Sequence, residues 1–93
     1  MSINTITVIG GGTMGNGIAH VAAQSGFSVT LVDVSQEALD RAVGTISKNL
    51  DRMVAKEKIS QADRDATLGR IATTTDLATG ASQADLVIEA ASE

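Results

Sequence analysis

Glycine and acidic residues stand at spacings that could bind a phosphorylated ligand. Gly10, Gly12 and Gly15 follow the apolar run ITVI, and a helix-like pattern begins directly after them. Asp33 ends the next apolar run. A glycine turn between a strand and a helix exposes backbone N–H groups to an anion, and an acid at the end of the second strand accepts hydrogen bonds from a ribose.

Each glycine has a separate physical role in this reading. Gly10 allows a tight turn, the missing side chain at Gly12 leaves room for a diphosphate, and Gly15 lets the helix lie close to the strand. The charge of Asp33 would repel a 2′-phosphate, which favours NAD over NADP. The predicted cofactor-binding residues of the loop are Gly10, Gly11, Gly12, Thr13, Met14 and Gly15.

Other functions use a similar turn. FAD-binding domains and methyltransferases also have a glycine-rich first turn and an acid after the second strand. A glycine turn that only packs a helix against a strand is the structural alternative. The agreement of strand, loop, helix and acid in one order favours dinucleotide binding.

Alternating elements must position this loop. Apolar, β-branched runs predict strands at residues 3–9, 28–33, 70–75 and 84–90, the last with the near-continuous apolar centre of a strand buried on both faces. Helical spacing predicts helices over 13–25, after Ser35 and after Ser60, and a turn or short helix before residue 84.

This alternation predicts the fold class. We expect an α/β, Rossmann-type parallel sheet of four strands in the order 3-2-1-4, with helices on both faces. The pattern ends just after the fourth strand, so we expect residues 1–93 to be the N-terminal part of a larger NAD-binding domain.

Charge and composition argue against several functions. Eleven acidic and seven basic residues give a net charge of −4, whereas nucleic-acid binding needs a basic surface. The sequence has no cysteine and one histidine, so we expect neither a disulfide nor a metal site. No run resembles a signal peptide or a membrane span, and we expect a cytoplasmic protein.

The stretch VIGGGTMGNGIAHVAAQSGFSVTLVDVSQEALDRA resembles the L-3-hydroxyacyl-CoA dehydrogenase family, especially bacterial 3-hydroxybutyryl-CoA dehydrogenases. The resemblance continues through DLVIEAASE and covers the whole chain. It implies hydride transfer between NAD and the C3 carbon of a short-chain 3-hydroxyacyl-CoA. One departure is Gly11, where the family usually has alanine.

The resemblance also implies roles for single residues. Asp33 matches the acid on the adenine ribose, and Glu93 matches a glutamate that reaches the nicotinamide-side ribose. Lys56 matches a lysine on the coenzyme A phosphates, and Asn49 matches a nearby coenzyme A contact.

Helical spacing places several cations on one stripe that also holds Asn49: Arg41, Lys48, Arg52 and Lys56. Such a stripe suits the phosphates of coenzyme A. The alternative is a solvated helix face with pairs such as Glu37 with Arg41.

The family's catalytic His–Glu pair follows the fourth strand, beyond this sequence. We therefore predict no catalytic residue within residues 1–93 and no turnover by this chain alone. His20 is predicted to lie mid-helix at a packing edge. The resemblance further implies a C-terminal helical domain for substrate binding and homodimerisation, absent from this chain. The alternative function is a free-standing dinucleotide-binding or regulatory module without catalytic activity.

Overall fold

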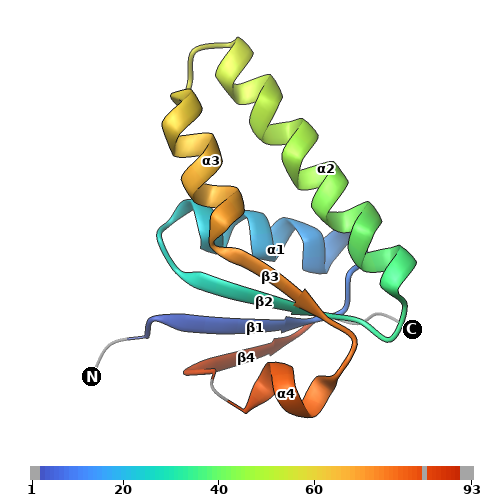
Figure 1. The fold of residues 1–93 in the computed structure, drawn as a ribbon. Coiled ribbons are helices and arrows are strands. Elements are labelled where there is room, and N and C mark those ends of the chain that lie inside the picture. The colour runs from blue at the N-terminus through green and yellow to red at the C-terminus, as the bar shows by residue number, and fades with distance from the viewer. Residues whose placement is uncertain (1–2, 83, 91–93) are drawn as a thin grey trace.

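The computed structural model describes residues 3–82 and 84–90 (Figure 1). Four parallel strands form one sheet in the order β3-β2-β1-β4, as predicted. The strands are β1 (Thr5–Ile9), β2 (Ser28–Val32), β3 (Ile71–Thr74) and β4 (Leu86–Glu89). The helices are α1 (Thr13–Gln24), α2 (Gln36–Ala55), α3 (Gln61–Gly69) and α4 (Leu77–Ala81).

The helices form two unequal layers around the sheet. α1, α2 and α3 lie on one face and the short α4 lies on the other (Figure 1). The apolar core is between the sheet and the three longer helices. Val8 and Leu31 are paired in register, and residues paired on parallel strands share a face, so both side chains enter this core. Its fully buried large side chains include Val8, Leu31, Leu39, Ile46 and Leu50.

Side-chain caps fix where three helices begin. Ser35 accepts a hydrogen bond from the Ala38 N–H at 3.2 Å, and Ser60 accepts one from the Asp63 N–H at 3.0 Å. Asp76 caps α4 by accepting from the Thr79 N–H at 3.3 Å. Each cap satisfies a backbone donor that the first helical turn leaves without a partner.

Two arginines tie the helical layer together. Arg64 on α3 donates to the Asp51 carboxylate at 2.9 Å and to the Ser47 hydroxyl at 3.0 Å, both on α2. Arg70 donates to the Ala23 carbonyl oxygen at 2.8 Å, near the end of α1. The Arg64 contacts join α3 to α2, and the Arg70 contact holds the end of this hairpin against α1.

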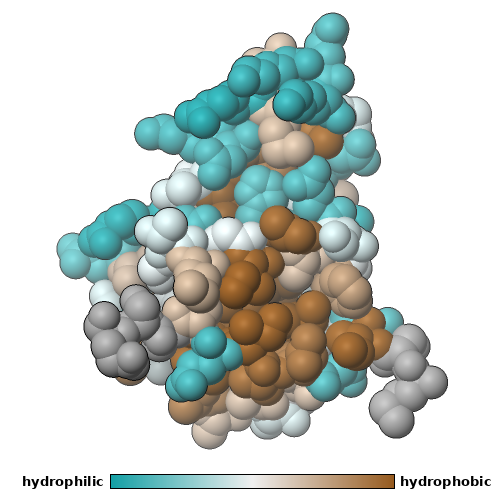
Figure 2. Space-filling model, turned by 180° about the vertical axis from the view of Figure 1, so that it is seen from behind, coloured by the Kyte–Doolittle hydropathy of each residue, from teal (hydrophilic) through white to brown (hydrophobic). Residues whose placement is uncertain are grey.

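Strand β4 differs from the prediction of a strand buried on both faces. Leu86 and Val87 are 39 % and 44 % exposed. The short α4 packs on β1, β2 and β3, and β4 pairs only with β1 among the described strands. Figure 2 shows apolar side chains gathered over the half of the molecule that holds the sheet. None of the described helices combines the length and apolarity needed to cross a bilayer.

Asp85 joins the start of β1 to the start of β4. Its carboxylate accepts hydrogen bonds from the N–H groups of Asn4 at 2.8 Å and Thr5 at 3.1 Å. These two bonds hold the pKa of the Asp85 carboxyl below its ordinary value of 3.8. The ionised carboxylate therefore stabilises the fold above that ordinary value, and this contribution is lost as the pH falls through the lowered pKa.

We therefore expect Asp85→Ala to lower the melting temperature at pH 7. The deficit should shrink as the pH falls from about 3.8 through the lowered pKa, below which the unmodified protein also lacks the ionised carboxylate. Melting curves followed by circular dichroism from pH 7 to pH 2.5 would measure it. Asp40→Ala removes an equal charge from α2 and serves as the control. A deficit that is independent of pH would contradict the electrostatic role of Asp85.

Candidate functional site

The turn between β1 and α1 has the geometry that its glycines predict. Gly10 has φ = 109°, a conformation that L side chains rarely adopt, and its N–H donates to the Val32 carbonyl oxygen at 2.7 Å. A Cβ on Gly15 would overlap the Gly10 carbonyl oxygen. Gly10 and Gly15 thus let the chain reverse from strand to helix within a few residues.

The first turn of α1 is open, unlike that of the other described helices. Gly12 is its N-cap residue, and no side chain among the described residues forms a cap hydrogen bond with its N–H groups. No acidic residue lies in that turn, and a Cβ at Gly12 would meet nothing within 4 Å. The uncapped N–H groups and the helix dipole together offer partial positive charge to an anion, and no side chain at position 12 blocks its approach.

Asp33 lies beside this turn, directly after β2. One carboxylate oxygen accepts from the Gly11 N–H at 2.8 Å and the other accepts from the Ser35 N–H at 3.0 Å. These two hydrogen bonds lower the pKa of the Asp33 carboxyl from its ordinary value of 3.8, so the group is ionised at neutral pH. Each oxygen keeps acceptor capacity for a further donor such as a sugar hydroxyl.

A cavity of about 180 Å³ adjoins Asp33 at the carboxyl ends of β1 and β2. Val34, Thr75 and Leu77 line it together with Asp33. Sequence reasoning did not single out these three residues. Their shared position depends on β2 and β3 being neighbours, which places the segments after both strands at one edge of the sheet.

A second hollow, of about 250 Å³, separates the glycine turn from α2. Its lining includes Gly12 and Asn16 on one side and Arg41 and Thr45 on the other. No ion pair joins Arg41 to Glu37 in the described part of the chain, where the ion pairs are those of Arg64 with Asp51 and Asp65.

The predicted coenzyme A residues follow Arg41 along α2 and at its end. Asn49 is half-buried, and Lys56, the residue that ends the helix, is exposed. With a rise of 1.5 Å per residue, Lys56 lies about 22 Å beyond Arg41 along the helix. The stripe therefore begins beside the glycine turn and runs away from it.

Two predicted residues remain, His20 on α1 and Glu93 at the end of the sequence. The His20 ring lies 3.0 Å from the Gln24 side-chain oxygen, so its hydrogen-bonding partner is four residues further along the same helix. Glu93, predicted to reach a ribose, lies outside the described residues.

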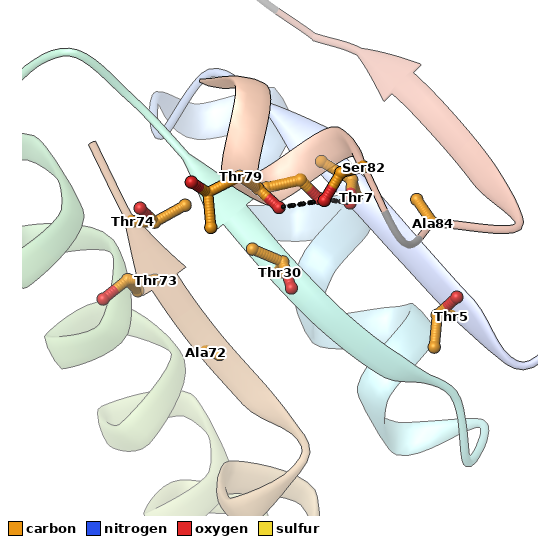
Figure 3. A pocket seen from close by; sticks show the side chains of 10 residues that line it. Thr5, Thr7, Thr30, Ala72, Thr73, Thr74, Thr79, Ser82 and Ala84 are labelled. Carbon is orange, nitrogen blue, oxygen red and sulfur yellow. Dashed lines mark hydrogen bonds between the residues drawn. The ribbon is translucent and has the colours of Figure 1, made fainter. Parts of the chain in front are cut away.

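A larger cavity of about 380 Å³ lies on the α4 face of the sheet (Figure 3). Its lining is rich in threonine, and several hydroxyls already have partners within the fold. Thr7 donates to the Gly80 carbonyl oxygen at 2.6 Å and Ser82 donates to the Thr79 carbonyl oxygen at 3.1 Å. None of the described residues that line it is charged, so the glycine turn is the better candidate for anion binding.

Comparison with known proteins gives a consistent result. The family model described as 3-hydroxyacyl-CoA dehydrogenase, NAD binding domain, matches residues 5–93. The 3-hydroxyadipyl-CoA dehydrogenase of Escherichia coli is 47 % identical over 93 residues, which are 100 % of this chain and 19 % of that protein. The 3-hydroxybutyryl-CoA dehydrogenase of Bradyrhizobium diazoefficiens is 45 % identical over 91 residues, which are 98 % of this chain and 31 % of that protein.

Solved structures agree with the sequence relatives. The crystal structure of 3-hydroxybutyryl-CoA dehydrogenase from Escherichia coli has a TM-score of 0.95 at 47 % identity, over 100 % of this chain and 20 % of that one. The chain thus spans between about a fifth and a third of the length of these relatives. A parallel sheet in 3-2-1-4 order, an open glycine turn and a family match over nearly the whole sequence lead to one assignment: the chain belongs to the 3-hydroxyacyl-CoA dehydrogenase family, as its NAD-binding domain.

Proposed function

We propose that this chain binds NAD across the glycine turn and orients it for a 3-hydroxyacyl-CoA dehydrogenase reaction. The observation that carries the proposal is the uncapped first turn of α1, open at Gly12 and adjacent to the ionised Asp33. The N–H groups of Thr13 and Met14 would bind the diphosphate, and Asp33 would accept hydrogen bonds from the adenine ribose.

The residues present suit this cofactor. Asp33 is held by two backbone N–H groups, so its carboxylate is fixed in place before a ligand arrives. A fixed anion at this position disfavours a 2′-phosphate and accepts ribose hydroxyls. When bound, NAD supplies the hydride chemistry, and the chain contributes binding and orientation.

No catalytic residue is assigned within the described part of the chain. The proposed reaction of the whole protein is hydride transfer between NAD and the C3 position of a short-chain 3-hydroxyacyl-CoA. The names of the relatives support an acyl-CoA substrate. Inactivity of this chain alone, a homodimeric whole protein, a cytoplasmic location and the ribose contact of Glu93 stay predictions.

The alternative of a binding module without turnover shares the NAD site. The family match favours the dehydrogenase, because the matching family model is the NAD-binding domain of such enzymes. Both functions require the same dinucleotide site, so the first experiment concerns binding.

Asp33→Asn is expected to remove the preference for NAD over NADP. The chain should bind NAD at least about ten-fold more tightly than NADP, because a hydrogen bond to a charged group contributes about 1.5–3 kcal/mol. The variant should bind the two with affinities within about three-fold. Isothermal titration calorimetry with both dinucleotides would measure this.

The control for that experiment is Asp63→Asn, which makes the same charge change in the exposed first turn of α3. It should keep the preference for NAD. Equal affinity of the unmodified chain for both dinucleotides would contradict the role of Asp33.

We also propose that the α2 stripe, with Asn49 and Lys56, contacts the phosphates of coenzyme A. The support is physical: the stripe is exposed, it begins beside the glycine turn, and Lys56 forms no ion pair in the described part of the chain. In a chain of net charge −4, such a cluster is a local site for anions.

Lys56→Gln is expected to weaken coenzyme A binding by roughly three- to ten-fold, because one exposed phosphate contact is lost. NAD binding should not change. Lys58→Gln removes the same charge two residues away and serves as the matched control. Calorimetric titration with coenzyme A at low and high salt would test it, and an equal loss in both variants would show that only overall charge matters.

A further inference from the structure

The hollow of about 250 Å³ between the glycine turn and α2 has polar side chains on both of its walls. Thr13 and Asn16 line it from α1, three residues apart and therefore on one face of that helix. Arg41 and Thr45 line it from α2, four residues apart. Both helices begin at the edge of the sheet where β1 and β2 end (Figure 1). A group bound in this hollow would therefore contact α1 and α2 together.

Three of these side chains have hydrogen-bonding capacity that the fold does not use. Within the residues that the structure describes, Thr13, Asn16 and Arg41 form no side-chain hydrogen bond or ion pair. Thr45, by contrast, donates to the Arg41 carbonyl oxygen at 3.0 Å. A guanidinium donates several hydrogen bonds and accepts none, and its planar fork matches the oxygens of a phosphate or a carboxylate. The partner that suits Arg41 in this hollow is therefore an oxyanion.

The charges around the glycine turn do not balance a bound diphosphate. The diphosphate of NAD is a dianion, whereas the N-terminus of a helix carries only about half a positive charge. The neighbouring Asp33 is ionised, because hydrogen bonds from Gly11 and Ser35 lower its pKa, and it adds a further negative charge. Among the described residues that line the two cavities at this turn, Arg41 is the only cation. It is the residue placed to offset this excess of negative charge.

We propose that Arg41 is a ligand of the cofactor diphosphate, which would lie between the first turn of α1 and the guanidinium on α2. This inference rests on the proposed NAD site and adds a residue to it. The Thr13 hydroxyl and the Asn16 amide would donate to the same phosphate oxygens. The first cation of the α2 stripe thus belongs to the dinucleotide, whereas Asn49 and Lys56, further along the helix, are left for coenzyme A.

Arg41→Gln tests this assignment. The variant should bind NAD about ten-fold more weakly at low salt, because a charge-assisted hydrogen bond to the diphosphate is lost. The factor should shrink as the salt concentration rises, since ions screen an exposed guanidinium. The melting temperature should stay within about 2 °C of the unmodified value, because the Arg41 side chain has no partner within the described residues. Isothermal titration calorimetry at two salt concentrations would measure the affinities.

The control is Lys58→Gln, which removes a positive charge from the exposed segment after α2. It should bind NAD with an affinity within about two-fold of that of the unmodified chain. An equal loss in Arg41→Gln and Lys58→Gln would overturn the proposal, because the effect would then come from overall charge and not from a contact at the turn.

Two further ligands identify the group that Arg41 contacts. ADP-ribose keeps the diphosphate, adenosine lacks it, and both keep the ribose proposed for Asp33. Arg41→Gln should weaken ADP-ribose binding by the same factor as NAD binding and leave adenosine binding unchanged. Adenosine binds through fewer contacts, so its affinity is best followed by the shifts of backbone amides. An equal loss for adenosine would overturn the contact with the diphosphate.

The outcomes separate this inference from the proposed function. Unchanged NAD affinity in Arg41→Gln, together with lost affinity in Gly12→Val, would overturn the role of Arg41 and keep the NAD site. A loss of coenzyme A affinity without a loss of NAD affinity would assign Arg41 to the other ligand and would also overturn it. If the unmodified chain binds neither NAD nor ADP-ribose, the NAD site and the role of Arg41 fail together.

Discussion

Gly15→Ala is expected to destabilise the fold more than any other single methyl addition to the glycine turn. The new Cβ would overlap the carbonyl oxygen of Gly10, which is a backbone atom and not the flexible end of a side chain. Gly10 cannot easily move away from the new Cβ, because its own N–H donates a hydrogen bond to the Val32 carbonyl oxygen. Its φ of 109° is a conformation that suits only glycine. Overpacking against backbone of this kind costs about 3 kcal/mol or more.

A cost of this size is a large share of the stability of a small domain, which is typically about 5–15 kcal/mol. For a chain of this length it would lower the melting temperature by roughly 12 °C or more. Thermal unfolding followed by circular dichroism would measure the shift.

Gly44→Ala provides the control for this experiment. A Cβ at this position in α2 would meet nothing within 4 Å, so the substitution should raise stability by about 0.5–1 kcal/mol through helix propensity. Equal melting temperatures for Gly15→Ala and the unmodified chain would show that α1 does not lie as close to the turn as described.

Gly12→Val is expected to have the opposite profile: an intact fold with lost binding. Gly12 has φ = −74° and ψ = −166°, which any residue can adopt, and a Cβ there meets open space. The far-ultraviolet circular dichroism and the melting temperature should therefore be unchanged. The valine would occupy the space in front of the N–H groups of Thr13 and Met14, and NAD affinity should fall by about 100-fold or more.

Gly69→Val, at the end of α3, is the matched control because it adds the same side chain in open space. It should bind NAD as the unmodified chain does. Retained binding by Gly12→Val would refute the argument that the diphosphate approaches the backbone at this position.

The two glycines show how far sequence reasoning reaches. Their spacing after a strand and before a helix predicted a tight turn and a close approach, and the φ of Gly10 and the packing of Gly15 confirm both. The contact partner of Gly15 was not predictable in detail, because it is the carbonyl oxygen of Gly10 within the turn itself.

Local patterns also predicted the strand order and the caps of the longer helices. Ser35 and Ser60 cap α2 and α3 as expected, because a cap depends only on residues three positions apart. Burial of β4 could not be derived in this way. Its apolar composition indicates what could be buried, whereas exposure depends on which elements cover the strand.

Val34 and Leu77, which line the cavity beside Asp33, show the same limit of prediction from local sequence. Val34 reads as a continuation of the second apolar run, and Leu77 reads as an ordinary helical residue. They share a cavity because β3 pairs with β2, a contact between segments about 40 residues apart in the chain. The predicted strand order already made β3 a neighbour of β2, but local spacing contains no information on which side chains after these strands line a common cavity.

The most direct test of the central claim is a titration of the ¹⁵N-labelled chain with NAD, followed by the chemical shifts of its backbone amides. The account predicts that the largest shifts occur at Gly12, Thr13 and Met14, with further shifts at Asp33 and Val34. Amides at the far end of α3, such as Gly69, should not move. If the largest shifts lie away from the glycine turn while those of Thr13 and Met14 stay constant, the diphosphate does not bind there and the account is wrong.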